Sequence, residues 1–229
     1  MRRESCAKLS AGQDYIHTLT CCALLAEVPE SSRERAAAEL QFHVQTWSRE
    51  ELILLEGQTV TDIAVLHSGT VRGEKFHMEG NVDLMYMYRK GETFGAEAAV
   101  SRFKSSPLTY IANEDAAVIR IPLSHIRQSA WAGPITQALL QILADDNIKK
   151  LYKIEVLSKR GLRDRILTHL RLMSQKAGSQ VFSIHMDRLQ FAQYLCVNRS
   201  ALSYELNQMK REGLIRFQKD RFELLEKKD

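Results

Sequence analysis

Residues 187–215 constrain the fold of this chain most, because they predict two short helices separated by a sharp turn. Asp187 and Gln190 have the spacing of a capping box, in which two side chains satisfy backbone amides at the start of a helix. The apolar periodicity of this first helix breaks at Cys196. Asn198 then has a side chain well suited to capping a helix, so a second helix is predicted to begin directly after it.

The second helix is predicted to have one apolar and one polar face. Leu202, Leu206 and Met209 follow one another at spacings of four and three, so they form a stripe that can pack on the first helix. In a helix-turn-helix, the N-terminal residues of the second helix contact base edges in the major groove of DNA. The candidate DNA-binding residues are Asn198, Arg199, Ser200, Ser203, Tyr204 and Asn207.

A hairpin is predicted after the second helix. Gly213 suits the position directly after a helix, where the backbone turns left-handed. Apolar residues alternate in residues 214–217 and 221–225, on either side of a short polar turn. Two amphipathic helices at a tight turn occur in many proteins, but a hairpin directly after them is typical of a winged helix. The C-terminal part therefore predicts DNA binding.

Charge is unevenly distributed along the chain. Residues 1–147 carry 14 Lys/Arg and 19 Asp/Glu, whereas residues 148–229 carry 18 and 9. The formal net charge of +4 thus hides a C-terminal part with a net charge of +9. Contacts to DNA phosphates need such a basic region, which agrees with the predicted DNA-binding helix.

We expect a cytoplasmic protein with no membrane partner. The N-terminus lacks the basic-then-apolar pattern of a signal segment, and the longest uncharged run, residues 128–144, contains Pro134 and several glutamines. The cysteines form no Cys-x-x-Cys pair, so we interpret them as free thiols or small apolar residues. They are Cys6, Cys21, Cys22 and Cys196.

The N-terminal part changes from helical to β character. Residues 14–42 are predicted to be mainly helical, and residues 43–121 contain short apolar segments separated by turns. Residues 51–55 and 63–67, each followed by a glycine turn, are two examples. Several short strands with regular glycine turns predict a small β-sandwich or jelly roll.

A long helix is predicted for residues 134–158. Its apolar residues recur at spacings of about 3.5 residues, which is the pattern of a coiled-coil dimer contact, and Asn147 could set the register. The alternative is that this stripe packs only on the β-rich part of its own chain. The candidate dimerisation residues are Leu140, Leu143, Asn147, Leu151 and Ile154.

The predicted fold class is α+β, with an N-terminal β-roll or jelly roll, a long dimerisation helix and a C-terminal winged helix-turn-helix. The predicted domains are residues 1–133 for the N-terminal helices and β-roll, 134–160 for the long helix and hinge, and 161–229 for DNA binding. No Ser-His-Asp constellation or phosphate-cradling glycine loop is visible, so we do not expect an enzyme.

This order of parts resembles the Crp/Fnr family of bacterial transcription regulators over nearly the whole chain. Residues 91–95 (Gly-Glu-Thr-Phe-Gly) and 67–69 (His-Ser-Gly) carry the resemblance in the β-roll, and the more specific residues 198–203 (Asn-Arg-Ser-Ala-Leu-Ser) carry it in the second helix. The resemblance implies a homodimer on palindromic double-stranded DNA, with Arg199 contacting guanine. It also implies an effector bound in a cyclic-nucleotide-binding-like domain, and makes RNA polymerase a candidate partner.

The resemblance also implies where the effector binds. Family members that bind cyclic AMP have a glutamate directly after the Phe-Gly pair and an Arg-Ser pair further along. Here Ala96 follows Gly95, and residues 104–107 (Lys-Ser-Ser-Pro) contain no arginine. If the segment continues as a strand, Glu97 faces the other side. We therefore expect an unknown small-molecule effector other than cyclic AMP, and no cofactor is assigned. The implied pocket residues are Phe94, Gly95, Ala96, Glu97, Ser105, Ser106 and Asn147.

Two alternatives stay open. A haem- or metal-dependent sensor needs axial ligands, and a cupin-type metalloenzyme needs a His-x-His pair with a following glutamate, whereas residues 77–79 (His-Met-Glu) supply one histidine. The iron–sulfur sensors of the family add a β-roll cysteine, but none lies between Cys22 and Cys196. We therefore assign no metal ligand. The histidines available to a haem are His17, His43, His67 and His77.

Overall fold

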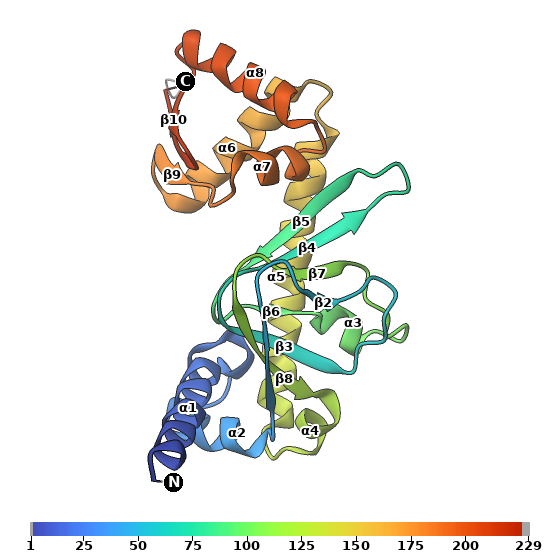
Figure 1. Ribbon diagram of the computed structural model, residues 1–229, viewed down its shortest axis with the longest axis vertical. Coiled ribbons are helices and arrows are strands. Elements are labelled where there is room, and N and C mark those ends of the chain that lie inside the picture. The colour runs from blue at the N-terminus through green and yellow to red at the C-terminus, as the bar shows by residue number, and fades with distance from the viewer. Residues whose placement is uncertain (1, 226–229) are drawn as a thin grey trace. The chain divides into compact units, whose positions relative to one another are not determined.

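The computed structural model describes the backbone of residues 2–225 and the side chains of residues 12–225 (Figure 1). The chain divides into two compact units. One contains the residues up to Lys75 together with Met85–Asp146, and the other contains Phe76–Leu84 together with the residues from Asn147 onward. The side chain of Cys6 lies outside the described residues.

The first unit contains the predicted β-roll, built from two four-stranded sheets. Their strand orders are β1-β8-β3-β6 and β2-β7-β4-β5. β3 pairs with β8 in antiparallel register, with Ile63 opposite Ile121. The strand bounds are β1 (His43–Trp47), β2 (Leu52–Leu54), β3 (Asp62–Ser68), β4 (Val71–Phe76), β5 (Val82–Tyr88), β6 (Thr93–Phe94), β7 (Thr109–Ala112) and β8 (Ala116–Pro122).

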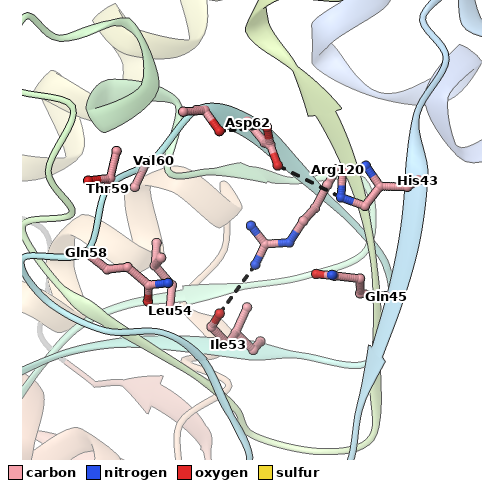
Figure 2. Close-up of a pocket in the computed structure, with 10 residues that line it drawn as sticks. His43, Gln45, Ile53, Leu54, Gln58, Thr59, Val60, Asp62 and Arg120 are labelled. Carbon is pink, nitrogen blue, oxygen red and sulfur yellow. Dashed lines mark hydrogen bonds and ion pairs between the residues drawn. The ribbon is translucent and has the colours of Figure 1, made fainter.

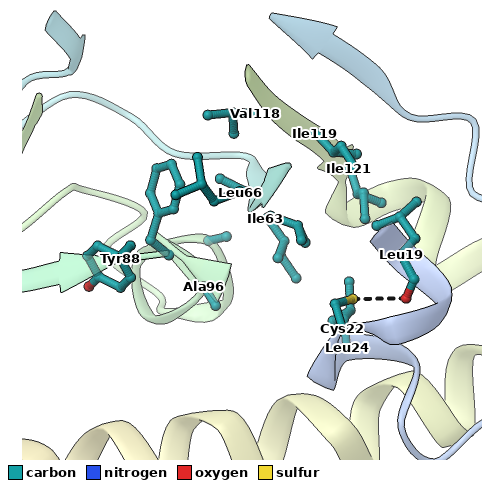
Figure 3. Close-up of a cluster of buried hydrophobic side chains, with 14 of the residues drawn as sticks. Leu19, Cys22, Leu24, Ile63, Leu66, Tyr88, Ala96, Val118, Ile119 and Ile121 are labelled. Atoms are coloured by element: carbon teal, nitrogen blue, oxygen red, sulfur yellow. Dashed lines mark hydrogen bonds between the residues drawn. The ribbon is translucent and has the colours of Figure 1, made fainter. Parts of the chain in front are cut away.

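Helical segments precede the β-roll and cover one of its sheets. Leu19 and Leu24 are fully buried in the same core as Ile63 of β3 (Figure 3). Because β3 is covered on both faces, residues 63–66 are all buried and apolar instead of alternating with polar residues. The helical bounds are α1 (Arg2–Cys21), η1 (Ala23–Leu25), η2 (Glu30–Ser32) and α2 (Arg33–Glu39).

The segment after β6 differs from the sequence prediction. Residues Ala96–Val100 form a short helix, α3, which begins directly after Gly95 in the left-handed conformation at φ +72°. Three of its five residues are buried alanines, and alanine has the highest helix propensity of all residues. The expectation that Glu97 follows the alternation of a strand was therefore wrong.

Two helices follow β8. The short α4 (Leu123–Gln128) is followed by α5 (Ala132–Ser158), which confirms the long helix predicted for residues 134–158. Ile135 and Leu139 of α5 are buried in the β-roll core. No helix in the described part of the chain combines the length and the apolar character that crossing a membrane requires.

The second unit has the predicted winged helix-turn-helix (Figure 1). Asp187 and Gln190 form the predicted capping box with both reciprocal hydrogen bonds, and Gly213 adopts a φ of +74° after the last helix. The stripe at Leu202, Leu206 and Met209 is fully buried. The bounds are α6 (Leu162–Ala177), β9 (Val181–Ser183), α7 (Arg188–Tyr194), α8 (Arg199–Arg211), β10 (Ile215–Gln218) and β11 (Arg221–Leu224), and the sheet order is β10-β11-β9.

A buried lysine joins three segments of the second unit. The side chain of Lys153, on α5, donates a hydrogen bond from Nζ to the backbone carbonyl of Leu84. The same Nζ lies 4.6 Å from the centroid of the Tyr194 ring, on α7. An ammonium group removed from water needs such partners. Burial lowers the pKa of Lys153 to about 8.

We expect His169 to make the second unit sensitive to acid. Burial, aided by the nearby Lys153 charge, lowers the pKa of His169 to about 4. The unfolded chain takes up this proton first as the pH falls, so the free energy of unfolding should decrease between about pH 6.5 and 4, by about 3 kcal/mol in total. Hydrogen exchange of α6 and α8 should measure this loss. His169→Phe should flatten it, and an unchanged slope in that variant would contradict the assignment.

Candidate nucleic-acid interface and effector region

The N-terminal end of α8 is organised by its capping residue. The Oδ1 atom of Asn198 accepts hydrogen bonds from the Ala201 amide at 2.8 Å and from the Ser200 hydroxyl at 2.9 Å. Asn198 was predicted both to cap this helix and to contact DNA. The cap is confirmed. Because Oδ1 is engaged in it, any contact of Asn198 with DNA would have to be made by its side-chain NH2 group.

Most of the predicted DNA-binding side chains lie on the solvent-facing side of α8. Arg199 is exposed and makes no ion pair with a described residue, so its guanidinium is available to a ligand. Tyr204 is 64% exposed, and its hydroxyl accepts a hydrogen bond from Gln208 at 2.9 Å. Asn207 is also exposed, whereas Ser203 is half-buried. Their contacts to DNA remain predictions.

A further basic residue lies close to this face, and the sequence analysis missed it. Arg188, the first residue of α7, stacks over the ring of Phe217 on β10, with 4.9 Å between the guanidinium carbon and the ring centroid. Burial and the neighbouring Arg199 charge lower the pKa of Arg188. Two guanidinium groups that repel each other favour an anion between or beside them. The signal in the sequence was an arginine directly after the capping Asp187.

A salt-bridge cluster links α8 to α6. The side chain of Arg163 on α6 donates to Glu205 at 2.6 Å and to both carboxylate oxygens of Glu212 at 2.7 and 2.9 Å. Glu205 lies in the middle of α8, and Glu212 is its C-cap residue. Both carboxylates are therefore engaged by Arg163.

The predicted effector residues fall into two groups. Phe94, Ala96 and Ser106 are buried, and the Ser106 hydroxyl donates to the Leu108 carbonyl at 2.6 Å. Ser105 is exposed, and Asn147 is exposed and belongs to the second unit. The structure thus brings the residues from Phe94 to Glu97 together as one strand end and helix start, whereas Asn147 is in a different unit.

Glu97 lies beside an aromatic cluster in the β-roll. The carboxylate of Glu97 accepts a hydrogen bond from the Tyr110 hydroxyl at 3.2 Å. The rings of Tyr88, Phe94 and Tyr110 have centroids 5.1–5.9 Å apart. Burial raises the pKa of Tyr110, so its hydroxyl stays protonated and donates to Glu97. An acidic side chain therefore faces the interior although Ala96 occupies the place after Gly95.

The predicted dimerisation residues are mostly exposed. Leu140, Leu151 and Ile154 are 63%, 53% and 62% exposed. Leu143 is half-buried and packs against the β-roll core, so this residue follows the alternative interpretation of the stripe. Asn147 is exposed between them. The apolar seam of α5, defined as Leu140, Leu151 and Ile154, is thus uncovered in the single chain.

The histidines are engaged separately. His67 lies 2.8 Å from the Thr18 hydroxyl, His77 lies 2.8 Å from Asp83, and His43 lies 3.9 Å from Asp62. Among the described side chains, no three His, Cys, Asp or Glu residues come close enough together to hold a metal ion. This finding gives no support to a cupin-type metal centre.

Two family models match the chain. A cyclic nucleotide-binding domain matches residues 44–130, and a Crp-like helix-turn-helix domain matches residues 164–228. The pair is the domain composition of a DNA-binding transcription regulator with an effector domain, and not of an enzyme.

Solved structures share the fold. FixK2 from Bradyrhizobium japonicum is 19% identical, with 81% of this chain and 93% of that chain covered and a TM-score of 0.65. CLP from Xanthomonas campestris, described as a c-di-GMP responsive global regulator, is 16% identical, with 87% and 100% covered and a TM-score of 0.69. A CooA variant from Carboxydothermus hydrogenoformans is 17% identical, with 81% and 84% covered and a TM-score of 0.69. No curated protein matches the chain in sequence.

Proposed function

Because the chain belongs to the Crp/Fnr family of transcription regulators, we propose that it acts as a homodimer on a palindromic operator, under the control of a small effector bound in the β-roll. The single observation that carries this proposal is the exposed N-terminal end of α8, where Arg199 makes no ion pair with any described residue. We assign effector binding to residues 1–133, dimerisation to residues 134–160 and DNA binding to residues 161–229.

The homodimer is supported by the apolar seam of α5. Leu140, Leu151 and Ile154 lie on one exposed side of a helix 27 residues long. A dimer that buries such a seam holds two recognition helices at a fixed separation, as half-sites one helical turn apart require. RNA polymerase remains a candidate partner that the family membership suggests.

Arg199→Ala is expected to weaken binding to the selected operator by roughly 1–3 kcal/mol, because a bidentate contact to guanine is lost. Binding to unrelated DNA should change less. A gel shift at matched salt concentration, on an operator selected from random sequences, measures both affinities. Arg211→Ala is the matched control, since it removes the same charge from the other end of α8. Equal affinities of parent and Arg199→Ala for the operator would show that Arg199 makes no base contact.

A further inference from the structure

A polar pocket of about 310 Å³ lies in the β-roll, lined from β1, β2, β3, β8 and the connection between β2 and β3 (Figure 2). Its polar side chains include His43, Gln45, Gln58, Thr59, Asp62 and Arg120. None of them is among the residues predicted to bind the effector. The volume is at the lower end of the range of small-molecule sites.

Arg120 is a cation without an ion-pair partner in this pocket. Figure 2 shows its guanidinium in the middle of the pocket, with Gln45 and Asp62 on two sides. Its Nη2 donates to the Ile53 carbonyl at 3.3 Å, and its buried Nε atom has no hydrogen-bond partner among the described residues. The Trp47 ring centroid is 5.4 Å from the guanidinium carbon. Burial lowers the pKa of Arg120, which indicates that the charge is incompletely compensated.

Arg72, in the same unit, is an arginine whose charge is compensated by carboxylates. Arg72 donates to Glu50 at 2.6 and 2.8 Å and to Glu74 at 2.8 Å, and these bonds raise its pKa. No carboxylate of the described residues lies within ion-pair distance of Arg120. A half-buried guanidinium gains most from an anion that accepts its donors, because charge-assisted hydrogen bonds replace the water it has lost.

We propose that this pocket binds a small organic anion, whose carboxylate or phosphate group is held by Arg120. Gln45, Gln58 and Thr59 line the same space and supply neutral donors. Asp62, paired with His43 at 3.9 Å, lies on one side and disfavours a second negative charge there. The ligand class is therefore a small molecule with one anionic group and a hydroxyl or amino group that can donate to Asp62.

The backbone connects this pocket to the predicted effector residues. The Ser106 amide donates to the Gln58 carbonyl at 2.9 Å, and the Gly57 amide donates to the Ser106 carbonyl at 2.8 Å. The Val60 amide donates to the Lys104 carbonyl at 2.9 Å. A ligand that contacts Gln58 would therefore touch a residue whose backbone is hydrogen-bonded to the segment that carries Ser105 and Ser106. This coupling rests on the proposed effector function, whereas the binding itself rests on the pocket alone.

Binding can be followed through the indole N–H resonance of Trp47, assigned as the peak that Trp47→Phe removes. Titration of the full chain with acetate, inorganic phosphate and L-lactate should shift this peak in a saturable way, with lactate binding most tightly. Arg120→Gln should weaken binding about tenfold or more, which corresponds to the loss of a charge-assisted contact. Arg120→Lys should weaken it less, because the charge remains but the planar pair of donors is lost.

Arg127→Gln is the charge-matched control, since Arg127 is exposed in the last turn of α4, and its affinities should equal those of the parent. The absence of a saturable shift in the parent chain with all three anions would overturn the proposal, whatever the variants do. Equal affinities of the parent and Arg120→Lys for all three anions would also overturn the role of the guanidinium. Neither result depends on whether the chain binds an operator, so the two proposals fail separately.

Discussion

Leu151→Asp is expected to convert the chain from a dimer into a monomer at micromolar concentration and to weaken operator binding by about a hundredfold or more. The residue is 53% exposed and belongs to the apolar seam of α5, so a dimer would bury it. A carboxylate there would be removed from water without a partner. Because two linked recognition helices would hold the proposed palindromic operator, the loss of the link should also remove most of the affinity.

Analytical ultracentrifugation of parent and variant, with a gel shift on the same samples, tests this expectation. Gln141→Asp is the matched control, since it places the same charge on an exposed position of α5 outside the seam. Its mass and its operator affinity should equal those of the parent. A parent chain that sediments as a monomer, or a Leu151→Asp chain that remains a dimer, would rule out this interface.

Cyclic AMP is expected to bind this chain about a thousandfold more weakly than a β-roll that has both the ribose-binding glutamate and the phosphate-binding arginine. Residues 104–107 provide no arginine. The carboxylate that does face the interior, Glu97, is already bonded to Tyr110 inside a packed aromatic cluster. A cyclic nucleotide would have to break that bond and would leave its phosphate without a guanidinium.

Calorimetry with cyclic AMP and cyclic GMP measures this directly, and low-micromolar affinity for either would disprove the interpretation of the pocket. Tyr110→Phe removes the hydroxyl that engages Glu97 while keeping the ring. If Glu97 can hold a ribose once it is released, this variant should bind cyclic AMP more tightly than the parent.

The sequence predicted the C-terminal part best because local signals agree there. Asp187, Gln190 and Asn198 act through hydrogen bonds to amides three residues away, so their roles depend on neighbours in the sequence. The glycine turns and apolar runs of the β-roll are local in the same sense. Such local signals predict the structure correctly because the packing of each element in the folded chain agrees with them.

Other features depend on tertiary contacts and could not be predicted in this way. The direction of Glu97 follows from a five-residue helix and from the position of Tyr110, which lies on another strand. Leu143 looked like its neighbours on the predicted seam, but the β-roll core covers part of it. The unpaired state of Arg120 is a property of the strands around it, and no pattern in the sequence distinguishes it from Arg72.

The contact between Lys153 and Leu84 means that the DNA-binding unit is discontinuous in the sequence. A fragment that begins at residue 147, where the second unit resumes, or at residue 161, where the predicted DNA-binding domain begins, lacks residues 76–84 and the backbone carbonyl of Leu84. The fragment that begins at 147 keeps Lys153 but lacks the Leu84 carbonyl that Lys153 binds. The fragment that begins at 161 lacks Lys153, the cation over the Tyr194 ring. The winged helix-turn-helix is therefore better studied within the full chain. Loss of DNA binding by an excised fragment would reflect the missing contacts of Lys153 and not the side chains of α8.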